Sequence, residues 1–123
     1  MDLSSLLPKD QTEVQILHPV TGEGLGITIT IAGPAHPAKV AFERTALDNR
    51  YKSKKAMDAA SLMAESEGEL VARTLAWTNV ELNSEVLDCT PENVASVYGN
   101  PGFFWLRNQV ARVTGDIQGF FLN

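Results

Sequence analysis

The run Ile27-Thr28-Ile29-Thr30-Ile31 constrains the fold of this chain more than any other segment. β-Branched residues in strict alternation predict a strand with one apolar and one polar face, here from Leu25 to Ala32. A weaker alternation from Glu13 to His18 predicts an earlier strand, and turn residues at 19–24 connect the two. The sequence therefore predicts a β-hairpin over residues 13–33, and its apolar face (Ile27, Ile29 and Ile31) needs a covering layer.

Two helix-forming segments follow the hairpin. The turn sequence Gly33–Pro37 predicts a helix start, and Val40, Leu47 and Tyr51 then fall on one helical face. A second helix is expected from Ala56 to about Trp77, where Gly68 marks a point at which it can kink. Its expected apolar stripe comprises Met57, Met63, Leu70 and Trp77.

The C-terminal part has clearer boundaries. Residues 78–89 are typical of a connector, with a short strand expected at Val80–Leu82. Thr90-Pro91-Glu92-Asn93 is a helix start with a threonine cap, and Val94 and Val97 are expected to face inward. A last helix is predicted from about Gly102 to Thr114. Its apolar side is expected to comprise Phe104, Leu106 or Trp105, Val110 and Val113.

These patterns predict one α+β domain over residues 1–123: an N-terminal β-hairpin packed on a bundle of about four helices. Residues 1–12 are expected to form a flexible arm, and residues 34–123 to be mostly helical. A chain of 123 residues can bury a substantial core.

Charge and composition favour some partners over others. The net charge of −5 opposes binding to phosphate backbones, so no nucleic-acid partner is expected. No apolar run approaches the length of a membrane helix, and the N-terminus has no signal-peptide pattern, so a cytoplasmic location without membrane contact is expected. The single cysteine, Cys89, excludes an intramolecular disulfide.

The sequence contains no established catalytic or cofactor-binding motif. The two histidines lie in proline-flanked turns, and no spacing typical of a zinc site or phosphate-binding loop is present. The strongest enzymatic hypothesis makes Cys89 a nucleophile, with His18 or His36 as its base and Asp88 nearby. The competing interpretation, which we favour, is that Cys89 is a small apolar residue before a helix cap. The sequence thus predicts a protein that binds other proteins, without a catalytic, metal or cofactor site.

Two clusters are candidate partner-binding sites. Aromatic residues crowd the C-terminal part, and three consecutive ones cannot all face one core because successive helical residues point about 100° apart. The terminal aromatics are expected either to cap the core or to form a surface for self-association or a partner. The basic cluster is expected to face water; as a binding site it would contact an acidic protein before nucleic acid. Together the candidates are Phe103, Phe104, Trp105, Arg107, Phe120, Phe121, Arg50, Lys52, Lys54 and Lys55.

Three segments carry a family resemblance. They are Leu70–Val80 (LVARTLAWTNV), Thr90–Val94 (TPENV) and Phe104–Val110 (FWLRNQV), and together they resemble the tail assembly chaperones of long-tailed, non-contractile phages. The front part, from His18 to Gly33, is similar to the strand–turn–strand opening of related tail proteins. The chain departs from the family pattern at Asn79 and at Asp88-Cys89, where the family often has glycine and an aromatic residue.

The resemblance implies a protein of the host cytoplasm that coats the tape measure protein, keeps it soluble during phage or prophage tail assembly, and is absent from the mature virion. It also implies a longer form, made by ribosomal frameshifting, that recruits the tail tube protein. The alternative is a small structural tail protein, a completion or tube-associated subunit, that stays in the virion.

Overall fold

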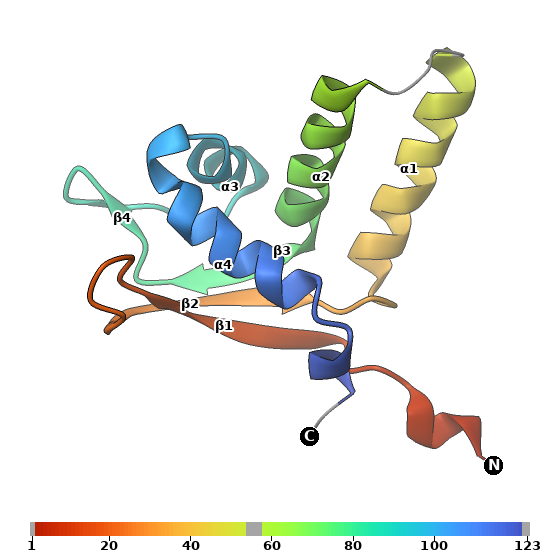
Figure 1. The fold of residues 1–123 in the computed structure, drawn as a ribbon, viewed down its shortest axis with the longest axis horizontal. Coiled ribbons are helices and arrows are strands. Elements are labelled where there is room, and N and C mark those ends of the chain that lie inside the picture. Colours follow the sequence, from red (N-terminus) through yellow and green to blue (C-terminus); the bar gives the residue numbers. More distant parts are fainter. Residues whose placement is uncertain (1, 54–57, 122–123) are drawn as a thin grey trace.

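The fold is built on a three-stranded antiparallel sheet with the helices on one side of it (Figure 1). A computed structural model describes residues 2–53 and 58–121. The strands are β1 (Gln11–Leu17), β2 (Gly24–Ala32) and β3 (Thr74–Thr78), and β2 lies in the middle. The helices are α1 (Pro37–Ser53), α2 (Ala59–Arg73), α3 (Pro91–Tyr98) and α4 (Phe104–Thr114). The predicted α+β class, a β-hairpin on four helices, is confirmed.

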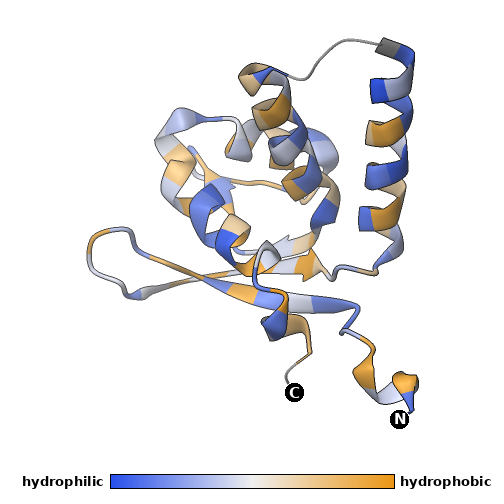
Figure 2. Cartoon of the chain, turned by 45° about the vertical axis from the view of Figure 1, so that its right-hand side comes forward, coloured by the Kyte–Doolittle hydropathy of each residue, from blue (hydrophilic) through white to orange (hydrophobic). Residues whose placement is uncertain are grey.

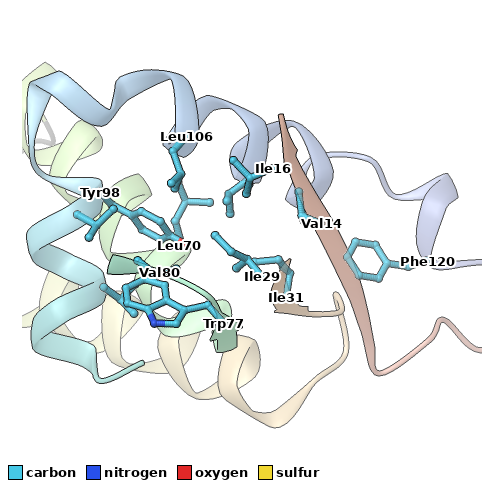
Figure 3. Packing of buried hydrophobic residues seen from close by; sticks show 13 residues of the cluster. Val14, Ile16, Ile29, Ile31, Leu70, Trp77, Val80, Tyr98, Leu106 and Phe120 are labelled. Atoms are coloured by element: carbon cyan, nitrogen blue, oxygen red, sulfur yellow. The ribbon is translucent and has the colours of Figure 1, made fainter. Parts of the chain in front are cut away.

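The β1–β2 hairpin pairs as the alternation predicted. Val14 lies opposite Ile29, and Gln11 lies opposite Ala32, so β1 begins earlier than expected. Ile29 and Ile31 are fully buried beneath the helices, whereas Ile27 is only half-buried (Figure 3). Before β1, a 3₁₀ turn at Leu3–Leu6 and a hydrogen bond from the Lys9 amide to the Phe120 carbonyl structure the segment expected to be a flexible arm.

The second predicted helix was too long. It ends at Arg73, and Thr74 begins β3, whose residues pair with β2 (Ile29 with Trp77, Ile31 with Thr74). The free edge of β2 supplies hydrogen-bond partners for this segment, and the threonine and tryptophan side chains favour a strand. Of the expected stripe, Leu70 and Trp77 are buried and Met63 is exposed, and Met57 lies outside the described residues.

The segment between β3 and α3 forms a small projecting hairpin. Strands β4 (Glu81–Leu82) and β5 (Glu85–Val86) pair through a turn in which Asn83 and Ser84 both have positive φ, as a type I′ turn requires. The Trp77 indole donates to the Leu87 carbonyl at 2.8 Å and fixes the base of this hairpin to the sheet.

The C-terminal helices follow their sequence signals. The Thr90 hydroxyl caps α3 by accepting from the Asn93 amide, and Val94 and Val97 face inward as predicted. A 3₁₀ turn at Pro101–Phe103 leads into α4, which buries Leu106 and Val110 but leaves Phe104 exposed. A further 3₁₀ turn (Gln118–Phe120) then returns the chain toward the N-terminal arm (Figure 1).

The expected apolar face of α1 is not buried. Leu47 and Tyr51 are exposed, and Figure 2 shows hydrophobic and hydrophilic residues alternating along this helix. Helix α1 packs mainly on α2, where the Phe42 ring lies against Gly68. Helix α2 runs through Gly68 without interruption. The two helices therefore form a hairpin that projects from the sheet.

Candidate functional site

Two apolar depressions lie on either side of α4. The first, which we call the aromatic cleft, has a volume of about 190 Å³. Its walls come from the β4–β5 hairpin and its base (Val80, Glu81, Leu82 and Leu87), from the α3–α4 region (Val97, Phe103, Trp105 and Leu106), and from Ile27 on β2. Phe103 and Trp105, two of the predicted site residues, thus share one site.

The aromatic cleft is held open by backbone geometry. The Leu87 amide donates to the Val80 carbonyl at 2.9 Å and closes the base of the β4–β5 hairpin. Asn79, with a φ of 61°, donates from its side chain to the Gly26 carbonyl at 2.8 Å and ties this base to β2. These contacts preorganise the cleft, which lowers the entropic cost of binding a partner.

The second depression, which we call the α2–α4 groove, is larger and more open, at about 560 Å³. Leu62 and Met63 project from α2 and are 49% and 71% exposed. The lining residues are Leu62, Met63, Ala64, Ser66, Glu67 and Leu70 of α2 and Arg107 and Ala111 of α4. An apolar groove between two helices is a common docking site for an amphipathic helix.

One ion pair spans the α2–α4 groove. Arg107 Nη1 lies 3.6 Å from Glu67 Oε1, and both side chains are about one-third exposed. Phe104 precedes Arg107 by three residues and Ala111 by seven, which places it on the same face of α4. Phe104 is 55% exposed at the N-terminal end of α4, beside the residues that line the groove but not one of them.

The remaining predicted site residues do not join either depression. Phe120 is buried and its ring packs into the core, as the capping hypothesis expects (Figure 3). Phe121 stays exposed. Arg50 and Lys52 lie in the last turn of α1, where Arg50 forms an ion pair with Glu65 of α2. Lys54 and Lys55 lie outside the described residues.

The two histidines of the nucleophile hypothesis accept hydrogen bonds within local turns, and Cys89 is partly buried. Burial raises the pKa of the Cys89 thiol, which disfavours the thiolate that a nucleophile requires. His18 Nδ1 accepts from the Val20 and Thr21 amides, and His36 Nδ1 accepts from the Ala38 amide. Within residues 2–53 and 58–121, no three His, Cys, Asp or Glu side chains are grouped to hold a metal ion.

The sequence reasoning missed most of the aromatic cleft. The short strand expected at Val80–Leu82 corresponds to β4, but its partner β5 and the position of Leu87 beside it lie in the segment predicted to be a connector. Leu62, which lines the α2–α4 groove, lay off the predicted stripe of its helix. Only the packing of α4 against α2 brings Leu62 and Arg107 to one surface.

Comparison of this chain with family models, curated proteins and solved structures finds no match. None of the helices in the described part of the chain is both long and apolar enough to span a membrane. The functional interpretation therefore depends on the two depressions and on the resemblance of the three segments.

Proposed function

We propose that this protein is a phage tail assembly chaperone that binds the tape measure protein in the host cytoplasm and keeps it soluble until tail tube subunits assemble around it. The observation that carries the proposal is the α2–α4 groove, whose exposed methionine and leucine suit a helical partner. Leu70 and Arg107, which line this groove, belong to the segments that resemble tail assembly chaperones.

The chemistry of the groove agrees with such a partner. A tape measure protein is a long helical chain that exposes apolar residues before it is enclosed. An apolar floor crossed by one ion pair can accept many related helical segments, because its contacts depend little on sequence. The net negative charge of the chaperone would keep many bound copies soluble.

Co-expression with the tape measure protein of the same phage or prophage tests this function. The wild-type protein is expected to keep the tape measure soluble, and Met63→Asp and Phe104→Ala are expected to reduce the soluble fraction severalfold. Val20→Asp is the matched control, since Val20 is 86% exposed in the β1–β2 turn, away from the groove. Variants are compared only after their melting temperatures show that they fold.

Two outcomes would contradict the proposal. If the wild-type protein does not keep the tape measure soluble, the function is wrong. If folded Met63→Asp and Phe104→Ala bind as well as wild type, the groove is not the site. Mass spectrometry of purified particles addresses the alternative, because a virion protein is retained at a fixed ratio to the tape measure, whereas a chaperone is absent.

The proposal includes a longer, frameshifted form that recruits the tail tube protein. A slippery heptamer near the codons of Phe120 and Phe121, with an overlapping reading frame, would support it. Immunoblotting of infected cells with an antibody to the N-terminal region would reveal the second product, and its absence would remove this part of the proposal.

A further inference from the structure

A single carboxylate borders the aromatic cleft. Eight of the nine lining residues are apolar, and the ninth is Glu81 of β4. Glu81 is exposed and forms no ion pair with any residue in 2–53 or 58–121. A carboxylate beside apolar walls of low dielectric concentrates its field at the mouth of the cleft, so it favours a ligand with a cationic group.

The walls of the cleft come from a segment without basic residues. No lysine, arginine or histidine occurs between Arg73 and Arg107, and this segment supplies every lining residue except Ile27. Glu85 lies opposite Leu82 in the β4–β5 hairpin, so its exposed side chain shares one hairpin face with a lining residue. The charged residues of the segment are all acidic: Glu81, Glu85, Asp88 and Glu92.

The two arginines of α4 do not neutralise this negative field. Arg107 points across the other depression, where its Nη1 lies 3.6 Å from Glu67 Oε1. Arg112 follows Trp105 by seven residues, which places it about 10 Å farther along the axis of α4. This separation exceeds the Debye length of about 8 Å at physiological ionic strength, so Arg112 contributes little at the cleft. The surroundings of the cleft are therefore acidic.

The aromatic cleft has room for one side chain. Its volume of about 190 Å³ lies below the range of roughly 300–1,000 Å³ typical of small-molecule sites. An apolar cavity of about 150 Å³ can bind benzene, so a phenyl ring or a leucine side chain fits this cleft. Phe103 and Trp105 line it, and aromatic rings attract both apolar groups and cations.

We propose that the aromatic cleft binds a segment of a partner protein in which a phenylalanine- or leucine-sized side chain stands next to a lysine or arginine. The apolar side chain enters the cleft, and the neighbouring cation lies beside Glu81. An acidic neighbour would be repelled there, so charge selects among apolar segments. The hydrogen bonds from Trp77 to Leu87 and from Asn79 to Gly26 hold the walls in place before binding.

This site is separate from the one that carries the proposed function. The aromatic cleft and the α2–α4 groove share no lining residue, and they lie on either side of α4. One copy can therefore hold two protein segments at once. The inference does not depend on which partner occupies the groove.

Short peptides test the cleft directly. Acetyl-Ser-Phe-Lys-Ser-amide is titrated into the isotope-labelled full chain, and the amide shifts of Leu82, Leu87 and Phe103 are followed by NMR. Saturable binding is expected with a dissociation constant on the order of a few millimolar, because the peptide offers one anchor and one exposed ion pair. Glutamine in place of the peptide's lysine should weaken binding about threefold, and glutamate about tenfold.

Two pairs of variants assign this binding to the cleft. Glu81→Lys should reverse the order, so that the glutamate peptide binds better than the lysine peptide. Glu85→Lys, an exposed position of the same hairpin outside the cleft lining, is the matched control and should keep the wild-type order. Leu82→Ser should weaken the lysine peptide about fivefold or more, whereas Val86→Ser should not, because Val86 does not line the cleft.

Phenethylammonium separates a protein segment from a small amine as the ligand, since it carries a ring and a cation without a peptide backbone. It is expected to bind no more tightly than the lysine peptide, and binding tenfold tighter would overturn the assignment to a protein segment. The proposal also fails if the lysine peptide leaves these amide shifts unchanged up to about 20 mM. Equal binding of the lysine and glutamate peptides, or the wild-type order in folded Glu81→Lys, would overturn it as well.

Tape measure solubility is measured separately. If it persists while the peptides do not bind, only this inference fails. If the peptides bind but the tape measure is not solubilised, only the proposed function fails.

Discussion

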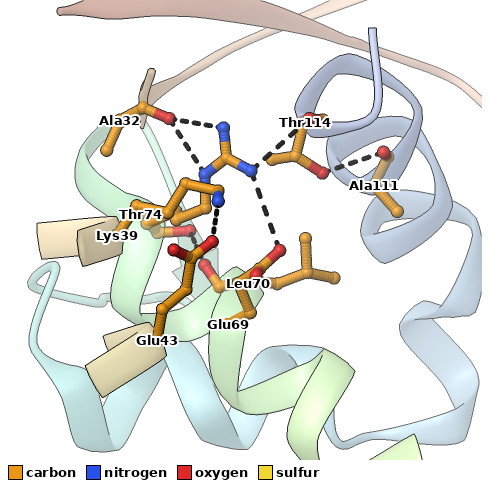
Figure 4. Close-up of polar contacts among 9 residues, drawn as sticks. Ala32, Lys39, Glu43, Glu69, Leu70, Thr74, Ala111 and Thr114 are labelled. Atoms are coloured by element: carbon orange, nitrogen blue, oxygen red, sulfur yellow. Dashed lines mark hydrogen bonds and ion pairs between the residues drawn. The ribbon is translucent and has the colours of Figure 1, made fainter. Parts of the chain in front are cut away.

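At the scale of single residues, the buried Arg73 connects several parts of the molecule. Its Nε and Nη2 donate to the Ala32 carbonyl at 3.0 and 2.8 Å, and its Nη1 donates to the Thr114 carbonyl at 3.4 Å (Figure 4). Its guanidinium carbon lies 5.8 Å from the centre of the Phe120 ring. Burial lowers the pKa of Arg73, and the carboxylates of Glu69 and Glu43 oppose this shift. The guanidinium thus links the ends of β2 and α4 to the C-terminal turn.

Arg73→Leu is expected to lower the free energy of unfolding by about 2–4 kcal/mol, because it leaves buried carbonyl groups without their donor. Arg73→Lys should lower the free energy of unfolding by less, but it should not match wild type, since an ammonium group cannot donate to both carbonyl groups as the planar guanidinium does. Urea unfolding measures both, with Arg112→Leu at an exposed position of α4 as control. Equal midpoints for wild type and Arg73→Leu would contradict this role.

The burial of Tyr98 makes the stability of the protein depend on pH. Burial raises the pKa of Tyr98 to about 12, and its hydroxyl lies 2.7 Å from the Thr74 hydroxyl. In the unfolded chain a tyrosine ionises near 10, so between about pH 10 and 12 only the unfolded state releases this proton. The stability held by neutral Tyr98 is fully present below about pH 10 and is lost as pH rises toward 12.

Urea unfolding from pH 8 to 12 measures this loss, which should reach roughly 2–3 kcal/mol. Tyr98→Phe serves as the reference, because it removes the ionisation while keeping the ring. Other groups that titrate in this range affect both proteins alike. Identical pH profiles for wild type and Tyr98→Phe would show that Tyr98 does not cause the loss.

At the scale of elements, the α1–α2 hairpin depends on one close approach. A Cβ added at Gly68 would lie 3.2 Å from Phe42 Cε2, so the glycine lets the two helices meet at the aromatic ring. Elsewhere the hairpin exposes Leu47, Tyr51, Leu62 and Met63. Because α1 buries little apolar surface, it should open more readily than the sheet.

Gly68→Val is therefore expected to separate α1 from α2. The added methyl groups displace the Phe42 ring, and hydrogen exchange of α1 amides should accelerate about tenfold or more while β2 amides keep their protection. Ala60→Val, at an exposed position of the same helix, controls for introducing a valine into α2. Because valine has a higher helix propensity than glycine, propensity alone would not weaken α2 in Gly68→Val. Unchanged exchange in α1 would show that the close approach does not hold the hairpin together.

At the scale of the whole molecule, both terminal segments meet at one edge of the sheet (Figure 1). The Lys9 amide donates to the Phe120 carbonyl, and the Phe120 ring is 1% exposed within the core. Phe121, its neighbour, is 45% exposed. Phe120 thus joins the C-terminal turn to the core, whereas Phe121 does not.

Phe120→Ala is expected to lower the free energy of unfolding by about 3 kcal/mol, because a large aromatic side chain leaves the core. Phe121→Ala should cost less than about 1 kcal/mol, since that ring is half exposed. Thermal unfolding of the two variants compares adjacent residues of the same type. Equal melting temperatures would mean that the turn does not contribute to the core.

Several features followed from the sequence because they depend on local chemistry. The alternation around Ile29 predicted β2 and its buried face, and Thr90 with Pro91 predicted the start of α3. The crowding of three aromatics on one helical turn predicted that one would be exposed, and Phe104 is. Such signals act over a few residues, so they need no knowledge of the partner element.

Other features were decided only by tertiary structure. Residues 74–78 form a strand because the edge of β2 offers them hydrogen bonds, which no local pattern reveals. Phe120 is buried and Phe121 is exposed because the C-terminal turn packs against the N-terminal arm. Since the two residues are identical and adjacent, the sequence does not indicate which of them is buried. The sequence by itself determined the β1–β2 hairpin, the start of α3 and the class of fold. Packing decided which edges and side chains meet, since those contacts join residues far apart in the chain.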